Sequence, residues 1–238
     1  TILVPSMLFL FQNCSNSTNS NWKQNNMDAS NDKAQVLVDD MLVRRDLVRE
    51  NEDGSLTLLE EGSSVPHLEG FKLGTKWTQG VVPVRFGSLV TPDHRQLFWQ
   101  AAKKWESVAH INFIQRTNQK TYVLVKASDP GCLAAYHGRE DGVNVLNLSD
   151  ESNCWVLGIA IHEIGHILGL AHEHQRRDRN KFINILTKKI LPDYLSNFDI
   201  IDAGTVTAAY DYDSIMQYGS FSSFAIDTSQ PIMTAKNG

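Results

Sequence analysis

The apolar positions of the first fifty residues form two groups, separated by a polar stretch. Met7–Phe11 is an apolar run far shorter than the roughly 20 residues of a membrane-spanning helix, and we interpret it as the end of an export signal. Residues 12–32 are dominated by Asn and Ser, which bury too little apolar surface to fold, so we expect a solvated tether. Between Lys33 and Glu50 apolar residues recur among charged ones, which predicts an amphipathic helix.

Beyond residue 50 the pattern changes from turn-rich to regular. Residues 51–70 are interpreted as a linker around a short extended stretch, Leu56–Leu59. From Trp77 onward the apolar pattern predicts three strands and two helices: strands Val81–Phe86, Tyr122–Lys126 and Val143–Leu148, and helices Pro92–Val108 and Val156–Leu170. Strands combined with a strongly apolar helix predict an α+β domain.

Composition narrows the class of protein. The 238 residues are 42% apolar and 21% charged, which is typical of a soluble globular protein. A formal net charge of −5 without a basic run lacks the attraction to phosphate on which nucleic-acid binding depends, so we predict no nucleic-acid partner. With 3 cysteines, at most one pair forms and one thiol is left over.

Candidate chemistry is concentrated in the last predicted helix. His162 and His166 are four residues apart, so both imidazoles leave one helical face and can share a metal ion. Glu163 lies beside the first ligand, where it can accept a proton from water. His172 would be a third ligand if the chain turned, and Gly169 can adopt the positive φ that such a turn needs. Three imidazoles leave zinc one open position, which indicates a catalytic site.

The other histidines carry no such pattern. Lone histidines are usually surface residues or hydrogen-bonded core residues, and we assign His67, His94, His110 and His137 to these ordinary roles.

The extended motif resembles that of the metzincin metallopeptidases, and its continuation resembles the astacin family. The run 172–179, His-Glu-His-Gln-Arg-Arg-Asp-Arg, is similar to an astacin signature, and residues 196–199 and 210–219 are similar to a further family stretch and to its Met-turn. Residues 77–83 resemble the start of the catalytic domain. The resemblance covers about Thr75 to Gly238 and implies a zincin fold: a twisted mixed sheet, an active-site helix and a mostly irregular C-terminal subdomain.

The resemblance also implies roles for individual residues. His162, His166 and His172 match the ligands of one catalytic Zn²⁺, and Glu163 matches the general base. Tyr218 matches a tyrosine that can bind the metal or swing away to stabilise the oxyanion. The implied activity is that of a zinc metalloendopeptidase of EC 3.4.24 type, acting on proteins or peptides.

Further positions are implied by the same resemblance. Met216 matches the methionine packed beneath the metal, and Glu173 matches the glutamate that anchors the new N-terminus after activation. Cys132 and Cys154 match one family disulfide, which implies an oxidising, extracytoplasmic compartment. Val143–Leu148 resembles the strand that lines the cleft and pairs with an extended substrate.

The domain organisation follows from these assignments. We expect an export remnant and tether at 1–32, a propeptide-like leader at 33–74 and a bacterial-type catalytic domain at 75–238, which lacks its final helix. The leader implies a zymogen. Three roles stay open for Cys14: a blocking thiolate on zinc, a lipid anchor, or none. Two alternative functions also stay open, a catalytically silent binding module and a zinc amidohydrolase acting on a non-peptide substrate.

Overall fold

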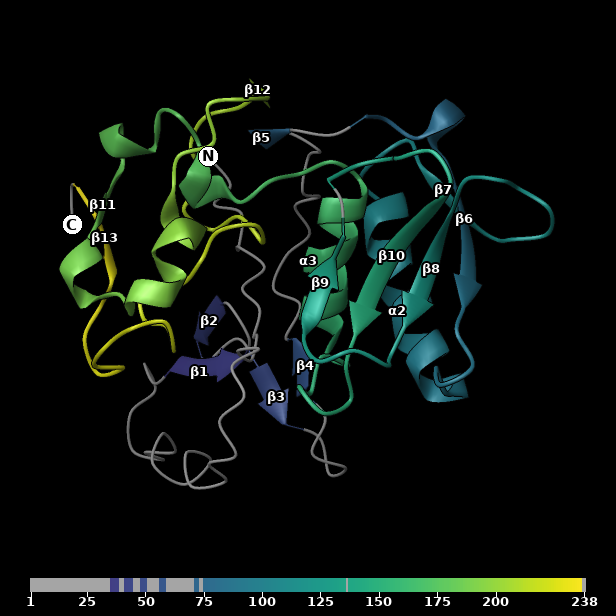
Figure 1. The fold of residues 1–238 in the computed structure, drawn as a ribbon, viewed down its shortest axis with the longest axis horizontal. Coiled ribbons are helices and arrows are strands. Elements are labelled where there is room, and N and C mark those ends of the chain that lie inside the picture. The colour runs from purple at the N-terminus through teal and green to yellow at the C-terminus, as the bar shows by residue number, and fades with distance from the viewer. Residues whose placement is uncertain are drawn as a thin grey trace.

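A computed structural model describes residues 75–135 and 137–236, together with the backbone of five short strands before residue 75 (Figure 1). The expectations for Met7–Phe11, Cys14 and the tether at 12–32 lie outside the described residues. Among the helices that are described, none has the length and apolar character needed to cross a membrane.

The segment predicted as an amphipathic helix is instead built of strands. β1 (Gln35–Val38) pairs antiparallel with β2 (Met41–Arg44), and Val38 lies opposite Met41. β3 (Val48–Glu50) pairs antiparallel with β4 (Leu56–Leu58). The helix prediction was therefore wrong. Its apolar residues come in short consecutive runs rich in valine, which favours strands, and the runs are separated by two aspartates, which favour turns. The extended stretch predicted at Leu56–Leu59 is confirmed by β4.

The centre of the molecule is a mixed five-stranded sheet. Its strands are β6 (Val81–Phe86), β7 (Asn112–Gln115), β8 (Tyr122–Lys126), β9 (Cys132–Ala134) and β10 (Val143–Leu148). They are ordered β7-β6-β8-β10-β9, and only β9 runs antiparallel to its neighbour. The three strands predicted from sequence have the predicted bounds, whereas β7 and β9 were not predicted.

The sheet order corrects one expectation. β10 lies between β8 and β9, so Val143–Leu148 is an interior strand and not the strand available to a substrate. The edge on that side belongs to β9 (Figure 1).

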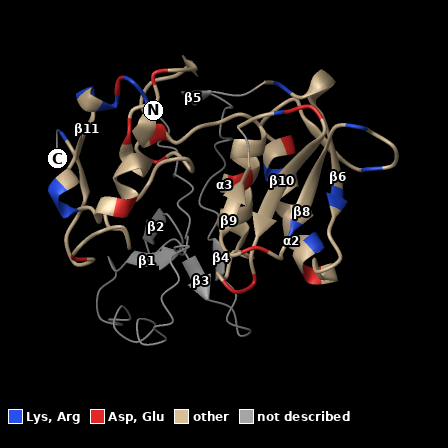
Figure 2. Ribbon diagram, in the orientation of Figure 1, with Lys and Arg blue, Asp and Glu red and all other residues tan. Residues whose placement is uncertain are grey.

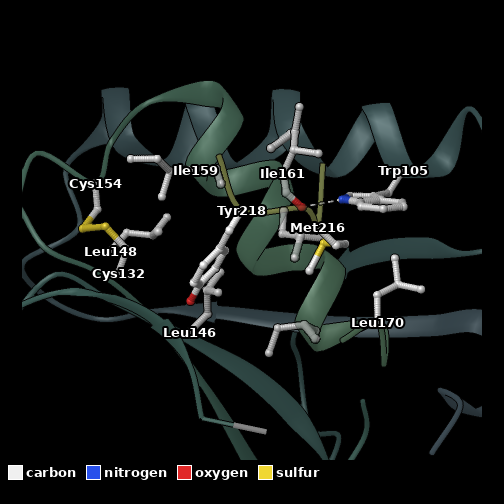
Figure 3. Close-up of a cluster of buried hydrophobic side chains, with 14 of the residues drawn as sticks. Trp105, Cys132, Leu146, Leu148, Cys154, Ile159, Ile161, Leu170, Met216 and Tyr218 are labelled. Carbon is white, nitrogen blue, oxygen red and sulfur yellow. Dashed lines mark hydrogen bonds between the residues drawn. A yellow bond between two sulfur atoms is a disulfide. The ribbon is translucent and has the colours of Figure 1, made fainter. Parts of the chain in front are cut away.

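Two helices pack against each other and against the sheet. α2 (Pro92–Glu106) begins where the Thr91 hydroxyl accepts a hydrogen bond from the amide of His94, and Pro92 occupies its first turn. α3 (Leu157–Ile167) is buried from Gly158 onward, and its Ile161 carbonyl accepts a hydrogen bond of 2.8 Å from Trp105 Nε1 (Figure 3). It ends three residues before the predicted bound.

The C-terminal half consists mostly of turns, as predicted. It contains short 3₁₀ segments and small strands, namely η3 (Glu173–Gln175), η4 (Arg179–Lys181), β11 (Ile183–Ile185), η5 (Thr187–Lys189), η6 (Pro192–Phe198), β12 (Thr205–Val206) and β13 (Met233–Ala235). β11 pairs with β13, and β12 pairs with β5 (Phe71–Lys72), while η2 (Thr78–Gly80) precedes β6. Acidic and basic residues are interspersed along the ribbon in Figure 2.

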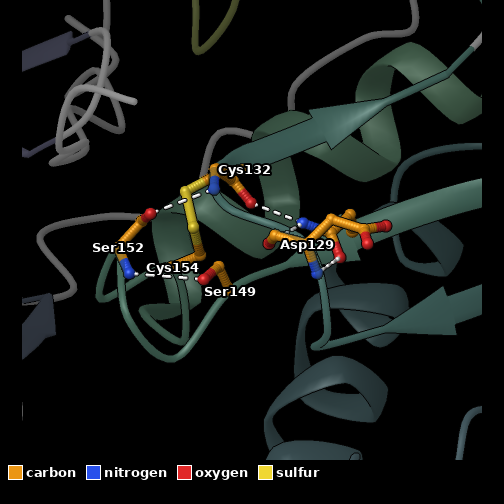
Figure 4. The surroundings of a disulfide bond; sticks show 7 residues. Asp129, Cys132, Ser149, Ser152 and Cys154 are labelled. Carbon is orange, nitrogen blue, oxygen red and sulfur yellow. Dashed lines mark hydrogen bonds between the residues drawn. A yellow bond between two sulfur atoms is a disulfide. The ribbon is translucent and has the colours of Figure 1, made fainter. Parts of the chain in front are cut away.

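One disulfide joins the sheet to the start of α3. Cys132 and Cys154 are bonded, with their Cα atoms 5.6 Å apart, which confirms the predicted pair (Figure 4). The Ser152 hydroxyl accepts a hydrogen bond from the amide of Gly131 beside it. The bond therefore ties the first residue of the edge strand β9 to the segment that leads into α3.

Candidate metal centre

The three predicted ligands come together at one point. α3 presents His162 and His166 one turn apart, and Gly169, with a φ of 100°, turns the chain so that His172 returns toward them. His172 Nε2 lies 3.2 Å from Nε2 of His162 and 3.2 Å from Nε2 of His166. This group is the only one among the described residues whose ligand atoms are close enough to hold a metal ion.

The other nitrogen of each ring identifies the tautomers. Nδ1 of His162 donates to the carbonyl of Ile215 at 2.7 Å, and Nδ1 of His166 donates to the carbonyl of Leu170 at 2.8 Å. Nδ1 of His172 lies 3.0 Å from the side-chain oxygen of Gln175. Because these oxygens only accept, each Nδ1 carries the proton, and three Nε2 lone pairs converge. Converging lone pairs repel one another unless a cation lies between them, so the residues fit a zinc ion.

The Met-turn packs directly beneath the helix that carries two of these ligands. A Cβ atom added at Gly165 would lie 2.7 Å from Sδ of Met216 and 3.2 Å from the Trp105 ring. The Met216 carbonyl accepts a 2.8 Å hydrogen bond from the amide of Glu173, the residue after the third histidine. Met216 therefore has the packing position that was predicted for it, and its segment contacts both parts of the ligand set.

Aromatic rings surround Tyr218 beside the third histidine. Tyr218 is 6% exposed, and its ring centroid lies 4.5 Å from that of His172 and 4.0 Å from that of His174. His174 is itself held by a 3.0 Å hydrogen bond from Nε2 to the carbonyl of Asn197. The ring of Phe224 stacks on that of Tyr218, with centroids 5.8 Å apart. The structure thus brings the predicted tyrosine to the metal ligands.

Glu163 is placed by α3 itself. It follows His162 on the helix and is 4% exposed, so its side chain is buried.

A buried ion-pair network lies behind the third ligand. Arg176 is 1% exposed and binds the carboxylates of Glu173 and Asp178, the latter through two hydrogen bonds of 2.9 and 3.0 Å. It also donates to the carbonyls of Ala208 and Ala209. Burial raises the pKa of Glu173 above its usual value, although the Asp211 amide and the Arg176 charge oppose that shift. Glu173 also accepts a hydrogen bond from the amide of Asp211. It therefore joins the loop that carries His172, which we call the third-ligand loop, to the segment at 210–219 that contains the Met-turn.

His137 was assigned to the ordinary histidines, but it lies beside the centre. Its ring meets the ring of His166 edge-on, with centroids 4.9 Å apart. Burial, followed by the neighbouring His172, lowers its pKa to about 4. The next residue, Gly138, donates from its amide to the carbonyl of His166 at 2.7 Å and pairs with Thr75. Little in the sequence indicated this position. His137 follows Cys132 by five residues, but the edge strand β9 that begins at Cys132 was not predicted.

The α+β fold and the three-histidine cluster, with two of its members on a His-Glu-x-x-His helix, are typical of metallopeptidases. Within that class, the family model for astacin, which describes a peptidase family, matches residues 71–238, so the chain belongs to the astacin family.

Individual relatives agree with this assignment. The human Tolloid-like protein 2 is 37% identical over 145 residues, which is 60% of this chain and 14% of that protein. The zinc metalloproteinase nas-12 of Caenorhabditis elegans is 28% identical over 232 residues, which is 96% of this chain and 58% of that protein. The chain therefore spans only part of the length of these curated relatives.

A solved structure shows the same fold. High choriolytic enzyme 1, a hatching enzyme zinc-protease from medaka (Oryzias latipes), superimposes with a TM-score of 0.64 at 29% identity, covering 70% of this chain and 82% of that chain. The predicted zincin fold is thereby confirmed. The bacterial type stays a prediction, since the relatives named here are animal proteins.

Proposed function

We propose that this chain is a zinc-dependent endopeptidase that hydrolyses internal peptide bonds of proteins. The observation that carries the proposal is the convergence of three Nε2 atoms, whose rings are oriented by hydrogen bonds from Nδ1. Membership of a peptidase family supports the same reaction.

The chain's own residues divide the chemistry among them. His162, His166 and His172 would hold the zinc ion, which when bound supplies Lewis acidity that polarises a carbonyl group and acidifies water. The Glu163 carboxylate takes the proton from the attacking water and later delivers it to the leaving amine. The Tyr218 hydroxyl donates a hydrogen bond to the oxyanion of the tetrahedral intermediate.

An extended substrate would pair with the outer edge of β9. The amide of Ala135 donates to the carbonyl of Val145, so the neighbouring Ala134 directs its own amide and carbonyl away from β10. No described residue pairs with that side of β9. Backbone hydrogen bonds to a peptide strand would bind substrates with little dependence on their side chains.

We also propose an extracytoplasmic location and a latent precursor form for this protein. The Cys132–Cys154 bond supports an extracytoplasmic location, because disulfides persist in oxidising compartments. The segment before residue 75 would act as a leader that keeps the enzyme latent.

Hydrolysis of a denatured protein tests the proposal. We expect cleavage to be abolished by a chelator and restored by zinc. Glu163→Gln should lower kcat by about 10²–10⁴-fold, because it removes the general base while leaving the ligands in place. Glu151→Gln, an exposed glutamate ahead of the same helix, is the matched control and should retain activity.

Two outcomes would contradict the proposal. Cleavage that a chelator does not affect would exclude the metal mechanism, and full activity of Glu163→Gln would exclude Glu163 as the base. Binding of peptides without any cleavage, by protein that retains zinc, would instead support a catalytically silent binding module.

A further inference from the structure

Two buried asparagines interrupt the apolar pattern of β10. Asn144 is 0% exposed and Asn147 is 1% exposed, in a strand whose Leu146 and Leu148 belong to the hydrophobic core. Burying an amide side chain is unfavourable unless its polar atoms are hydrogen-bonded. Both asparagines are bonded, and their closest partners lie in one segment, the chain from Asp129 to Gly142.

Asn147 holds the beginning of that segment. Its Nδ2 donates to the carbonyls of Asp129 and Gly131, each at 2.7 Å, and its Oδ1 accepts from the amide of Asp129 at 3.3 Å. Both amide protons and the oxygen are therefore used on the short stretch that precedes β9.

Asn144 holds the other end. Its Oδ1 accepts from the amide of Glu140 at 2.8 Å, and its Nδ2 donates to the carbonyl of Glu140, also at 2.8 Å. This reciprocal pair imitates one step of a β-ladder. Longer contacts from Nδ2 reach the carbonyls of Gly142 and Tyr122, at 3.4 and 3.5 Å.

The segment that the two asparagines hold, residues 129–142, includes groups that contact the histidine centre. It includes the edge strand β9, whose outer side at Ala134 pairs with no residue in the described part of the chain, and then His137, whose ring contacts that of His166. Gly138 donates to the carbonyl of the same metal ligand. β9 itself is only three residues long, so its few ladder hydrogen bonds leave most of the segment to be positioned by other contacts.

We propose that Asn144 and Asn147 are positioning residues that clamp the edge-strand segment at both ends and thereby set where an extended peptide lies relative to the metal ligands. This inference rests on the proposed endopeptidase function and concerns the part of the substrate that pairs with β9. Asparagine suits the role because one side chain both donates to a carbonyl and accepts from an amide. An aspartate would lose the donors and place a carboxylate against carbonyl oxygens, and a leucine would remove all of these hydrogen bonds.

The test compares long and short substrates in clamp variants. Asn147→Leu and Asn144→Leu keep a similar volume but lose the hydrogen bonds, and Asn112→Leu is the control because Asn112 is exposed on β7, the opposite edge of the sheet. Steady-state kinetics are measured with a peptide of about ten residues and with one of about four residues that has the same scissile bond.

We expect the clamp variants to raise KM for the long peptide about tenfold with little change in kcat, because edge-strand pairing is weakened while the metal centre is intact. The short peptide, which gains little from the edge strand, should be hydrolysed as by the unmodified protein. Zinc affinity, measured by competition with a chelator, should not change. The control should match the unmodified protein in each measurement.

Equal changes for both peptides, or no change for either, would overturn the clamp. If a leucine variant does not fold, Asn147→Asp preserves the shape and one acceptor, and the same selective rise in KM is expected. If the unmodified protein cleaves neither peptide, the proposed function fails while the clamp stays testable. Amide exchange across residues 129–138 should then be faster in the clamp variants than in Asn112→Leu, and equal rates would overturn it.

Discussion

At the scale of single residues, the side chain with many hydrogen bonds near the three histidines is that of Arg176, which is not one of the candidate metal ligands. Arg176 lies beneath the third-ligand loop with its charge matched by Glu173 and Asp178 and its remaining donors used by backbone carbonyls. Its guanidinium also lies 5.2 Å from the centroid of the Tyr210 ring. A charge buried so completely is tolerated only while every partner is present.

We predict that Arg176→Met lowers the free energy of unfolding by about 3–5 kcal/mol, because it leaves the buried Glu173 carboxylate without its counter-charge. Urea denaturation followed by tryptophan fluorescence measures the change. Arg177→Met is the matched control: Arg177 is exposed, and its replacement should alter stability by less than about 0.5 kcal/mol. Equal effects of the two variants would show that the network contributes no net stability.

Some residues at or near the candidate metal centre could be predicted from the sequence, and others could not. The four-residue spacing of His162 and His166 and the glycine at 169 are local signals, and the structure places all three ligands as that pattern predicted. The contacts of His137 and of Asn147 involve the segment around the edge strand β9, which was not predicted. Their positions follow from the order of strands in the sheet, and no local pattern records that order.

At the scale of elements, the same distinction separates the correct predictions from the wrong ones. The interior strands β6, β8 and β10 are five or six residues long and predominantly apolar, which is why their bounds were predicted. β7 and β9 are shorter, with four and three residues, and β7 begins and ends with a polar residue. The helix predicted at 33–50 was wrong because the apolar residues there come in short consecutive runs, such as 36–38 and 41–43, and not at the spacing of a helical face. β10 could not be recognised as interior, since pairing partners lie far away in sequence.

The packing of α3 on the Met-turn leads to a second prediction. Gly165→Ala inserts a methyl group where Met216 and Trp105 already meet, so the Met-turn must shift. The Ile215 carbonyl, which orients His162, would shift with it. We expect zinc affinity to fall about tenfold, in the range for lost partners of a metal ligand, as measured by competition with a chelator.

A double variant provides the control for this prediction. Met216→Ala in the same chain removes the obstacle, so the two substitutions together should reduce zinc affinity by less than the sum of their separate effects. Additive losses would mean that Gly165 and Met216 do not act through one contact.

The disulfide leads to a prediction about β9 and α3 as a connected pair. The disulfide joins two cysteines that are 22 residues apart in the chain. Replacing both Cys132 and Cys154 by serine should lower the free energy of unfolding by about 3 kcal/mol, because the unfolded chain is then no longer cross-linked. Urea denaturation measures the loss, and the unmodified protein treated with a reductant should show a similar one. Unchanged stability in both would mean that the bond is not needed to hold the edge strand.

At the scale of the whole molecule, the metal centre lies at the junction of two differently built halves. The sheet and its helices supply His162 and His166, and the turn-rich C-terminal half begins at the loop that carries His172. The hydrophobic core runs through both halves without a break, from Val82 in the sheet to Ile232 near the last strand. Zinc would therefore bind at a point where the two halves already share their packing.

We predict that the native state is stabilised by zinc as well as activated by it. A ligand that binds only the folded chain adds about 2.7 kcal/mol when present at 100 times its Kd, so the Tm should rise with zinc concentration after chelation. His172→Ala, which lacks one ligand, should respond much less. A Tm that is independent of zinc in the unmodified protein would contradict the proposed site.

Two hydrogen bonds, from His162 to Ile215 and from Glu173 to Met216, attach the Met-turn both to a candidate metal ligand and to the beginning of the C-terminal half. Metal binding and the packing of the C-terminal half would therefore depend on the same segment. Thermodynamic coupling of this kind is reciprocal. If bound zinc strengthens the attachment of the C-terminal half by some factor, then anything that loosens that half weakens zinc binding by the same factor. Molecules that attach to the outer turns of this half could thus regulate metal occupancy without approaching the histidines.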